Sequence, residues 1–176
     1  QCPNVSVSGA LPTVPGKVAT IQPSTGLAEA PTGLPPAVGN VIDKLIAAGN
    51  QIHTLPYIWG GGHGVPLDQI QAGYDCSGST GYILYKAGLL QGEALVSGDF
   101  EHWGDPGPGK YVTIFSNPTH VFIEVDGIVL DTAPYAPVVP AGSGPRWQPA
   151  SMIQAQINGD ISAGNGGFTE THPPSL

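Results

Sequence analysis

The chain has 176 residues, of which 10% are charged, and its formal net charge is −8. This length suits one domain with a hydrophobic core, and the 26 glycines and 19 prolines predict many turns. Lysine and arginine are too few to form a basic surface, and no apolar run approaches the ~18 residues of a membrane span, so we expect neither a nucleic-acid partner nor a transmembrane segment.

The first part of the chain, residues 1–37, contains seven prolines, which favour extended chain over helix. We expect a proline-rich arm or linker here and a single domain over residues 38–176. A further hypothesis is that residues 1–36 lie on the domain and restrict access to its groove; docking on the rear of the domain is the alternative. No charged segment followed by an apolar one begins the chain, so we expect any signal peptide to have been removed.

Two helices are predicted in the first half of the domain. Apolar residues recur every three to four positions over residues 38–50, and Gly49 with Asn50 predicts the end of that helix. The second helix covers residues 77–87, with Asp75 as its N-terminal cap. Between the helices, Gly60, Gly61 and Gly62 allow positive φ angles and close backbone approach, which is typical of a groove wall. Residues 91–110 are rich in turn formers and predict one long surface loop.

Strands are predicted over residues 111–115, 120–125 and 128–131, with Asp126-Gly127 forming a type I′ hairpin turn. A two-residue turn pairs Val125 with Ile128 and Ile123 with Leu130. His120 and Asp131 then share the opposite face as diagonal neighbours, with Cβ atoms roughly 7 Å apart. Beyond residue 133 turns prevail, apart from a short helix over residues 148–157.

Cys76 is the only cysteine in the middle of the chain, and it falls in the first turn of the predicted second helix. A helix N-terminus favours the thiolate, which is the nucleophilic form. His120 would act as base and Asp131 would orient its imidazole; simple packing of the cysteine is the alternative. Cys2 is expected to be a free thiol, with dimerisation or pairing with Cys76 as further options.

No His-Glu-x-x-His or Cys-x-x-Cys spacing predicts a metal site. His63, which lies on the glycine loop, is a candidate for lining the groove. Trp59, Trp103 and Trp147 are candidates for a sugar or peptide groove, with core packing as the alternative. The guanidinium of Arg146 suits either a substrate carboxylate or an internal partner.

Three sequence blocks carry a resemblance to a known family. Residues 57–61 (Tyr-Ile-Trp-Gly-Gly), residues 74–78 (Tyr-Asp-Cys-Ser-Gly) and His120-Val121 resemble the signature blocks of the NlpC-type cell-wall cysteine peptidases, over about residues 38–133. Residues 56–64, 144–147 and 167–174 are similar to a secreted actinobacterial-type branch. The resemblance implies an α+β fold with a compact papain-like core, in which the helix bearing the nucleophile packs on an antiparallel sheet.

The same resemblance implies roles for individual residues. Cys76 would be the nucleophile, His120 the base and Asp131 the third residue, a position where the family usually has histidine, asparagine or glutamine. Tyr57 would donate to the oxyanion beside the Cys76 N–H group, and Ser77 and His63 would help to position the substrate.

The implied activity is that of a secreted, cell-wall-associated hydrolase. It would cleave amide bonds in peptidoglycan stem peptides through an acyl-enzyme intermediate and without a cofactor. The alternative is a catalytically silent module that keeps the groove and binds the cell wall or a protein partner.

Overall fold

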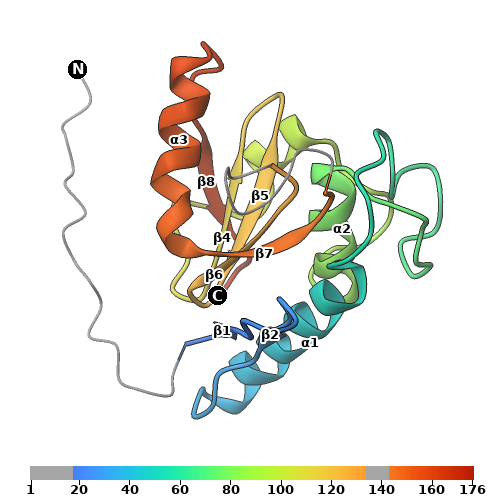
Figure 1. Cartoon of the computed structure of the whole chain (residues 1–176). Coiled ribbons are helices and arrows are strands. Elements are labelled where there is room, and N and C mark those ends of the chain that lie inside the picture. The colour runs from blue at the N-terminus through green and yellow to red at the C-terminus, as the bar shows by residue number, and fades with distance from the viewer. Residues whose placement is uncertain (1–17, 134–142) are drawn as a thin grey trace.

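The computed structural model of the chain describes residues 18–133 and 143–176. A central sheet separates two layers of helices (Figure 1). Helices α1 (Pro36–Ile52) and α2 (Cys76–Lys86) lie on one side of the sheet, and α3 (Ile153–Ser162) lies on the other. This is the predicted α+β architecture, with the helix that bears Cys76 packed on the sheet.

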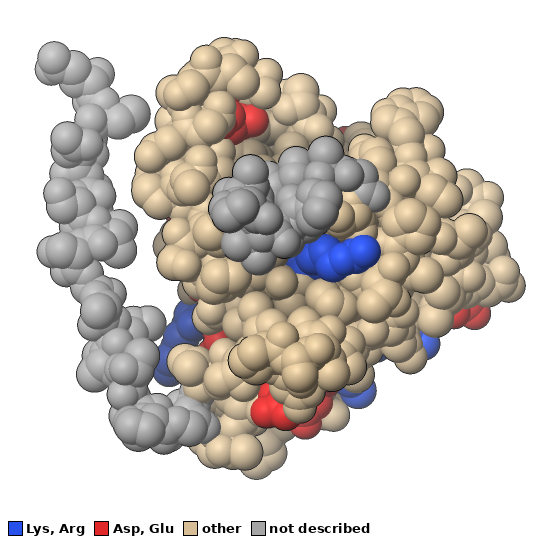
Figure 2. Space-filling model, in the orientation of Figure 1, with Lys and Arg blue, Asp and Glu red and all other residues tan. Residues whose placement is uncertain are grey.

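The sheet has six strands in the order β3-β8-β4-β5-β6-β7, and every neighbouring pair is antiparallel. Its strands are β3 (Asp105–Pro106), β4 (Val112–Ser116), β5 (Val121–Val125), β6 (Ile128–Asp131), β7 (Arg146–Pro149) and β8 (Thr169–His172). In the two described stretches of chain, no helix is both long and apolar enough to cross a membrane. The face of the molecule drawn in Figure 2 carries only scattered charged residues.

The β5–β6 hairpin has the register predicted from its turn. Ile123 pairs with Leu130 and Val125 with Ile128, and both turn residues have the positive φ of a type I′ turn: 45° at Asp126 and 98° at Gly127. One face of the hairpin packs against α1 and α2 in the main core. The other face, with Phe122, packs against α3. Because helices cover both faces of the sheet, the side that carries Asp131 is buried rather than open to solvent.

Helix α1 continues past the predicted end at Gly49-Asn50, so that boundary was wrong. Gly49 is instead a point of close packing, because a Cβ atom there would lie 2.2 Å from Cζ2 of Trp147 on β7. The next residue, Asn50, accepts a hydrogen bond from the Trp147 indole at 2.9 Å and another from the Ala28 N–H at 2.8 Å. These two residues therefore dock the helix on distant parts of the chain instead of ending it.

Three further expectations about secondary structure need correction. Residues 91–110 are not one surface loop, because they contain the 3₁₀ helix η1 (Ser97–His102), whose Phe100 is fully buried in the core. The helix expected over residues 148–157 begins later: β7 and the 3₁₀ helix η2 (Ala150–Met152) precede α3. Strands β7 and β8 were not predicted, since neither shows the alternation of apolar and polar residues that marks a half-buried strand.

The proline-rich segment is described only from residue 18 onward, and residues 1–17 lie outside the described structure. Strands β1 (Thr20–Ile21) and β2 (Ala28–Glu29) form a small hairpin beside α1. The Ala19 N–H donates to the Asp126 carbonyl at 3.0 Å, and Ala19 is buried. Residues 18–35 thus pack on the domain, and none of them lines the cavity at Cys76. Restriction of access by the arm stays a prediction.

Candidate active site

Cys76 is the first residue of α2, at the place the sequence indicates. The cap is Asp75, whose Oδ1 accepts a hydrogen bond from the Gly78 N–H at 2.7 Å. Gly78 has no side chain at a point where a Cβ atom would lie 2.0 Å from the Gly61 carbonyl oxygen. The Asp-Cys-Ser-Gly block therefore caps the helix, places the thiol in its first turn and lets the glycine loop approach.

The glycine loop reaches α2 through its backbone. Gly60 and Gly62 have φ angles of 76° and 88°, which favour glycine. The Gly60 N–H donates to Asp75 Oδ2 at 3.0 Å, and the Asp75 N–H donates to the Gly61 carbonyl at 3.2 Å. The predicted close approach of this loop is confirmed, and it fixes the wall of the site beside Cys76.

His120 and Asp131 form the pair that the hairpin register predicts. Nε2 of His120 lies 2.8 Å from Oδ1 of Asp131, whose side chain is fully buried. The same oxygen accepts the Ala133 N–H at 2.8 Å, and Asn117 holds the His120 backbone through a 2.9 Å hydrogen bond. One carboxylate oxygen of Asp131 thus accepts two hydrogen bonds, and the imidazole is held both by this oxygen and through its own backbone.

The Cys76 side chain lies close enough to the His120 imidazole to raise the pKa of His120 through hydrogen bonding and charge. Burial of His120 disfavours its charged form, but the charge and hydrogen bond of Asp131, with a smaller contribution from Cys76, raise the pKa of His120 to about 10. The imidazole therefore carries a proton at neutral pH, and it lies between a carboxylate and the thiol. This arrangement can hold a thiolate and later protonate a leaving group.

A second histidine–carboxylate pair involves Asp75, the residue that precedes Cys76. Nε2 of His63 is 3.0 Å from Asp75 Oδ1 and 2.9 Å from Ser77 Oγ. The hydrogen bond to Asp75 raises the pKa of His63 above its usual value. Burial opposes ionisation of Asp75, yet the hydrogen bonds from His63 and from the Gly78 N–H hold its pKa below the usual value. The sequence pointed to His63 but not to this partnership, because no periodicity links a loop residue to a helix cap.

A cavity of about 490 Å³ opens beside Cys76. His63 and Ser77 line it, and so do Tyr57 and Trp59, which precede the glycine loop. Burial, followed by the charges of Cys76 and Asp75, raises the pKa of Tyr57. Its hydroxyl therefore keeps its proton and can act as a hydrogen-bond donor near the thiol.

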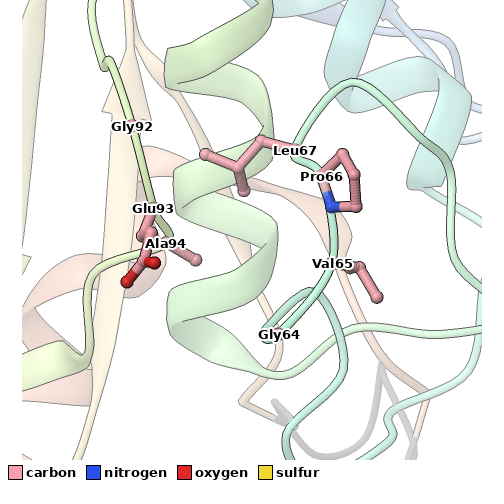
Figure 3. Close-up of a pocket in the computed structure, with 7 residues that line it drawn as sticks. All are labelled: Gly64, Val65, Pro66, Leu67, Gly92, Glu93 and Ala94. Carbon is pink, nitrogen blue, oxygen red and sulfur yellow. The ribbon is translucent and has the colours of Figure 1, made fainter.

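A second cavity, of about 420 Å³, lies between residues 64–67 and residues 92–94 (Figure 3). Most of its labelled side chains are apolar, and Glu93 supplies a carboxylate. Two segments of the chain contribute residues to both cavities: Gly64 directly follows His63 of the first cavity, and Ala94 lies two residues before Val96 of the first cavity.

Three other candidates turn out to be structural. Trp147 is buried against α1, and Trp103 is partly buried with its ring edge-on to Phe100. Arg146 donates to the backbone carbonyls of His53 and Leu55, the latter at 3.1 Å, so its guanidinium is engaged internally. Within residues 18–133 and 143–176, Cys76 is a free thiol and no three metal-ligating side chains gather in one place. Cys2 lies outside the described residues.

No protein-family model matches the chain, and no curated protein does. Among solved structures, the peptidoglycan hydrolase RipB of Mycobacterium tuberculosis superposes with a TM-score of 0.50 and 21% identity, over 79% of this chain and 68% of RipB. The fold is that of the NlpC/P60 hydrolases.

Two other solved structures are similar. An NLP/P60-family, lipoprotein-like protein of Staphylococcus aureus gives a TM-score of 0.49 at 17% identity, over 82% of this chain and 44% of its own. A hypothetical invasion protein of M. tuberculosis gives a TM-score of 0.47 at 21% identity, over 92% of this chain and 76% of its own. The likeness to RipB confirms the fold inferred from the three sequence blocks.

Proposed function

We propose that the protein is a secreted, cell-wall-associated thiol hydrolase that cleaves amide bonds in peptidoglycan stem peptides. The observation that carries this proposal is the chain of contacts from the Cys76 thiol through His120 to Asp131 at the start of a capped helix. The shared fold with RipB, itself described as a peptidoglycan hydrolase, supports the choice of substrate. No step of the mechanism requires a cofactor.

The first half of the reaction forms an acyl-enzyme. The Cys76 thiolate attacks the carbonyl carbon of the amide, and the oxygen takes the negative charge. The Cys76 N–H belongs to the first turn of α2, where N–H groups have no acceptor within the helix. This N–H and the Tyr57 hydroxyl are the proposed donors to the oxyanion. The His120 imidazolium then gives its proton to the leaving nitrogen as the C–N bond breaks.

The second half hydrolyses the thioester. Acylation removes the thiolate, whose charge is among the causes that raise the pKa of His120. The pKa of His120 therefore falls once the acyl-enzyme has formed, and the imidazole, which has given its proton to the leaving nitrogen, can act as a base. It takes a proton from water, the hydroxide adds to the thioester carbonyl, and Cys76 leaves as the thiolate. Asp131 holds the ring throughout, and His63 and Ser77 are proposed to position the substrate.

Alkylation with iodoacetamide tests this proposal against a silent binding module. A Cys2→Ser variant limits the reaction to Cys76, and activity toward stem peptides is followed in parallel. We expect iodoacetamide to alkylate Cys76 stoichiometrically and activity to fall in step with labelling. His120→Ala should slow the labelling. A Cys76 that is inert in folded protein contradicts the thiol mechanism and favours the module.

A further inference from the structure

Trp59 is the feature that the proposed mechanism leaves unexplained. Trp59 is 88% exposed. Among the other large apolar residues that the structure describes as exposed, the highest exposed fraction is 55%. Tryptophan side chains are usually largely buried, because their apolar area is large. Trp103 and Trp147 follow that rule in this protein. An indole kept in water at the rim of a reactive cavity points to a ligand.

The backbone on both sides of Trp59 is fixed. The Ile58 N–H donates to the Tyr74 carbonyl at 3.3 Å, and the Gly60 N–H donates to Asp75 Oδ2 at 3.0 Å. Tyr74 and Asp75 immediately precede Cys76, so the indole is tied to the same short segment that places the thiol. A rigid backbone lowers the entropy lost when a ligand stacks on the ring.

The remaining chemistry of the cavity favours a neutral, hydroxylated ligand. Trp59 and Tyr57 supply aromatic surface to the cavity, and Ser97 and Thr119 also line it. The two hydroxyls donate to the Pro118 carbonyl and to Asn117 Oδ1, so their oxygens remain as acceptors for a ligand. Among the described residues that line it, none is lysine or arginine, and the one acidic residue, Asp75, is already bonded to His63 and to two backbone N–H groups. A pyranose ring presents apolar C–H groups on its face and hydroxyls at its edge, which matches this combination.

We propose that Trp59 stacks on a sugar ring of the glycan strand, so that the Cys76 site prefers stem peptides still attached to sugar over free peptides. This inference rests on the proposed function and specifies its substrate. In peptidoglycan the sugar is joined to the first residue of the stem peptide. A peptide that reaches Cys76 therefore carries the sugar toward the rim of the cavity, where the indole lies.

The test compares one stem peptide in two forms, free and linked to its disaccharide, as substrates of wild type, Trp59→Ala and Trp59→Phe. We expect wild type to prefer the linked form and Trp59→Ala to reduce that preference about tenfold, mainly through KM, with Trp59→Phe intermediate. Ile161→Ala, which removes another exposed apolar side chain, on α3, should keep the wild-type preference.

Equal losses on both substrates, or no loss on either, would overturn the sugar assignment. Reversible self-association that Trp59→Ala abolishes, with substrate preference intact, would also overturn it and assign the indole to protein contacts. If wild type cleaves neither form, the proposed function fails, but the contact between Trp59 and the sugar can still be tested by binding. Binding of the disaccharide-peptide to Cys76→Ala protein should then be weakened by Trp59→Ala, and unchanged affinity refutes the stacking.

Discussion

Replacing Asp131 with asparagine should lower the pKa of His120 markedly. The rise of that pKa from 6.5 to about 10 corresponds, at 1.36 kcal/mol per pH unit, to about 5 kcal/mol of preference for the charged imidazole. The carboxylate charge and its hydrogen bond supply the larger part of this preference, and Cys76 supplies the rest. Asparagine keeps an oxygen acceptor but removes the charge, so we expect a fall of about 1 to 3 pH units.

The same substitution changes how stability depends on pH. Because folding raises the pKa of His120, its contribution to stability is complete below pH 6.5 and is lost as the pH rises through about 10. The difference in unfolding free energy between wild type and Asp131→Asn should therefore be larger at neutral pH than near pH 11. Activity should remain measurable in Asp131→Asn and drop further in Asp131→Ala, which cannot orient the ring at all.

The assay is NMR titration of the His120 ring protons, assigned with a His120→Gln spectrum. Glu124→Gln is a matched control. It removes one negative charge from β5, the strand that begins directly after His120 and contains its neighbour Phe122, but Glu124 does not contact the imidazole. We expect the control to leave the pKa of His120 close to that of wild type. If Asp131→Asn also leaves it unchanged, the carboxylate is a strand-end residue only and the electrostatic account of the site is wrong.

Four further substitutions probe other parts of the site. Cys76→Ala should abolish hydrolysis and His120→Ala should come close to doing so, because residues that act as a unit do not lose activity additively; peptide release and circular dichroism measure activity and folding. Gly78→Ala should destabilise the protein by about 1 to 3 kcal/mol in denaturant titrations, since its Cβ would lie 2.0 Å from the Gly61 carbonyl oxygen. His63→Ala should cost roughly 1 kcal/mol near pH 5 and less at pH 9. The stability from Asp75 is lost as the pH falls through its lowered pKa, and that from His63 as the pH rises through its raised pKa.

Each of these expectations has a result that opposes it. Turnover by Cys76→Ala equal to wild type would discard the thiol mechanism. A Gly78→Ala protein as stable as wild type would mean that the glycine loop moves aside without cost. If His63→Ala destabilises the protein equally at both pH values, its partnership with Asp75 is packing rather than charge.

The pairing of His120 with Asp131 was predictable because local rules set it. A two-residue turn at Asp126-Gly127 fixes the pairing of its strands, and alternation then places His120 and Asp131 on one face. The Asp75 cap likewise follows from its position just before a helix that ends at a glycine. These inferences involve residues close together in the chain, so they did not depend on knowing the rest of the fold.

Other features arise from contacts between distant parts of the chain. Gly49 would end a helix by its own preference, but the Trp147 ring needs the space that a side chain would fill. Strand β8 holds threonine, glutamate and histidine, and it becomes a strand because β4 and β3 offer hydrogen-bonding edges. His63 finds Asp75 only when the glycine loop closes on α2. Such choices come from tertiary packing, which overrides local preference.

The most direct test of the account is digestion of purified peptidoglycan by wild type and by Cys76→Ala, with the soluble products identified by mass spectrometry. Cleavage of an amide bond adds one water and leaves a new amino group and a new carboxyl group within a stem peptide. The account predicts such fragments from wild type and none from Cys76→Ala. Fragments cut only between sugars, or identical products from both proteins, would contradict it.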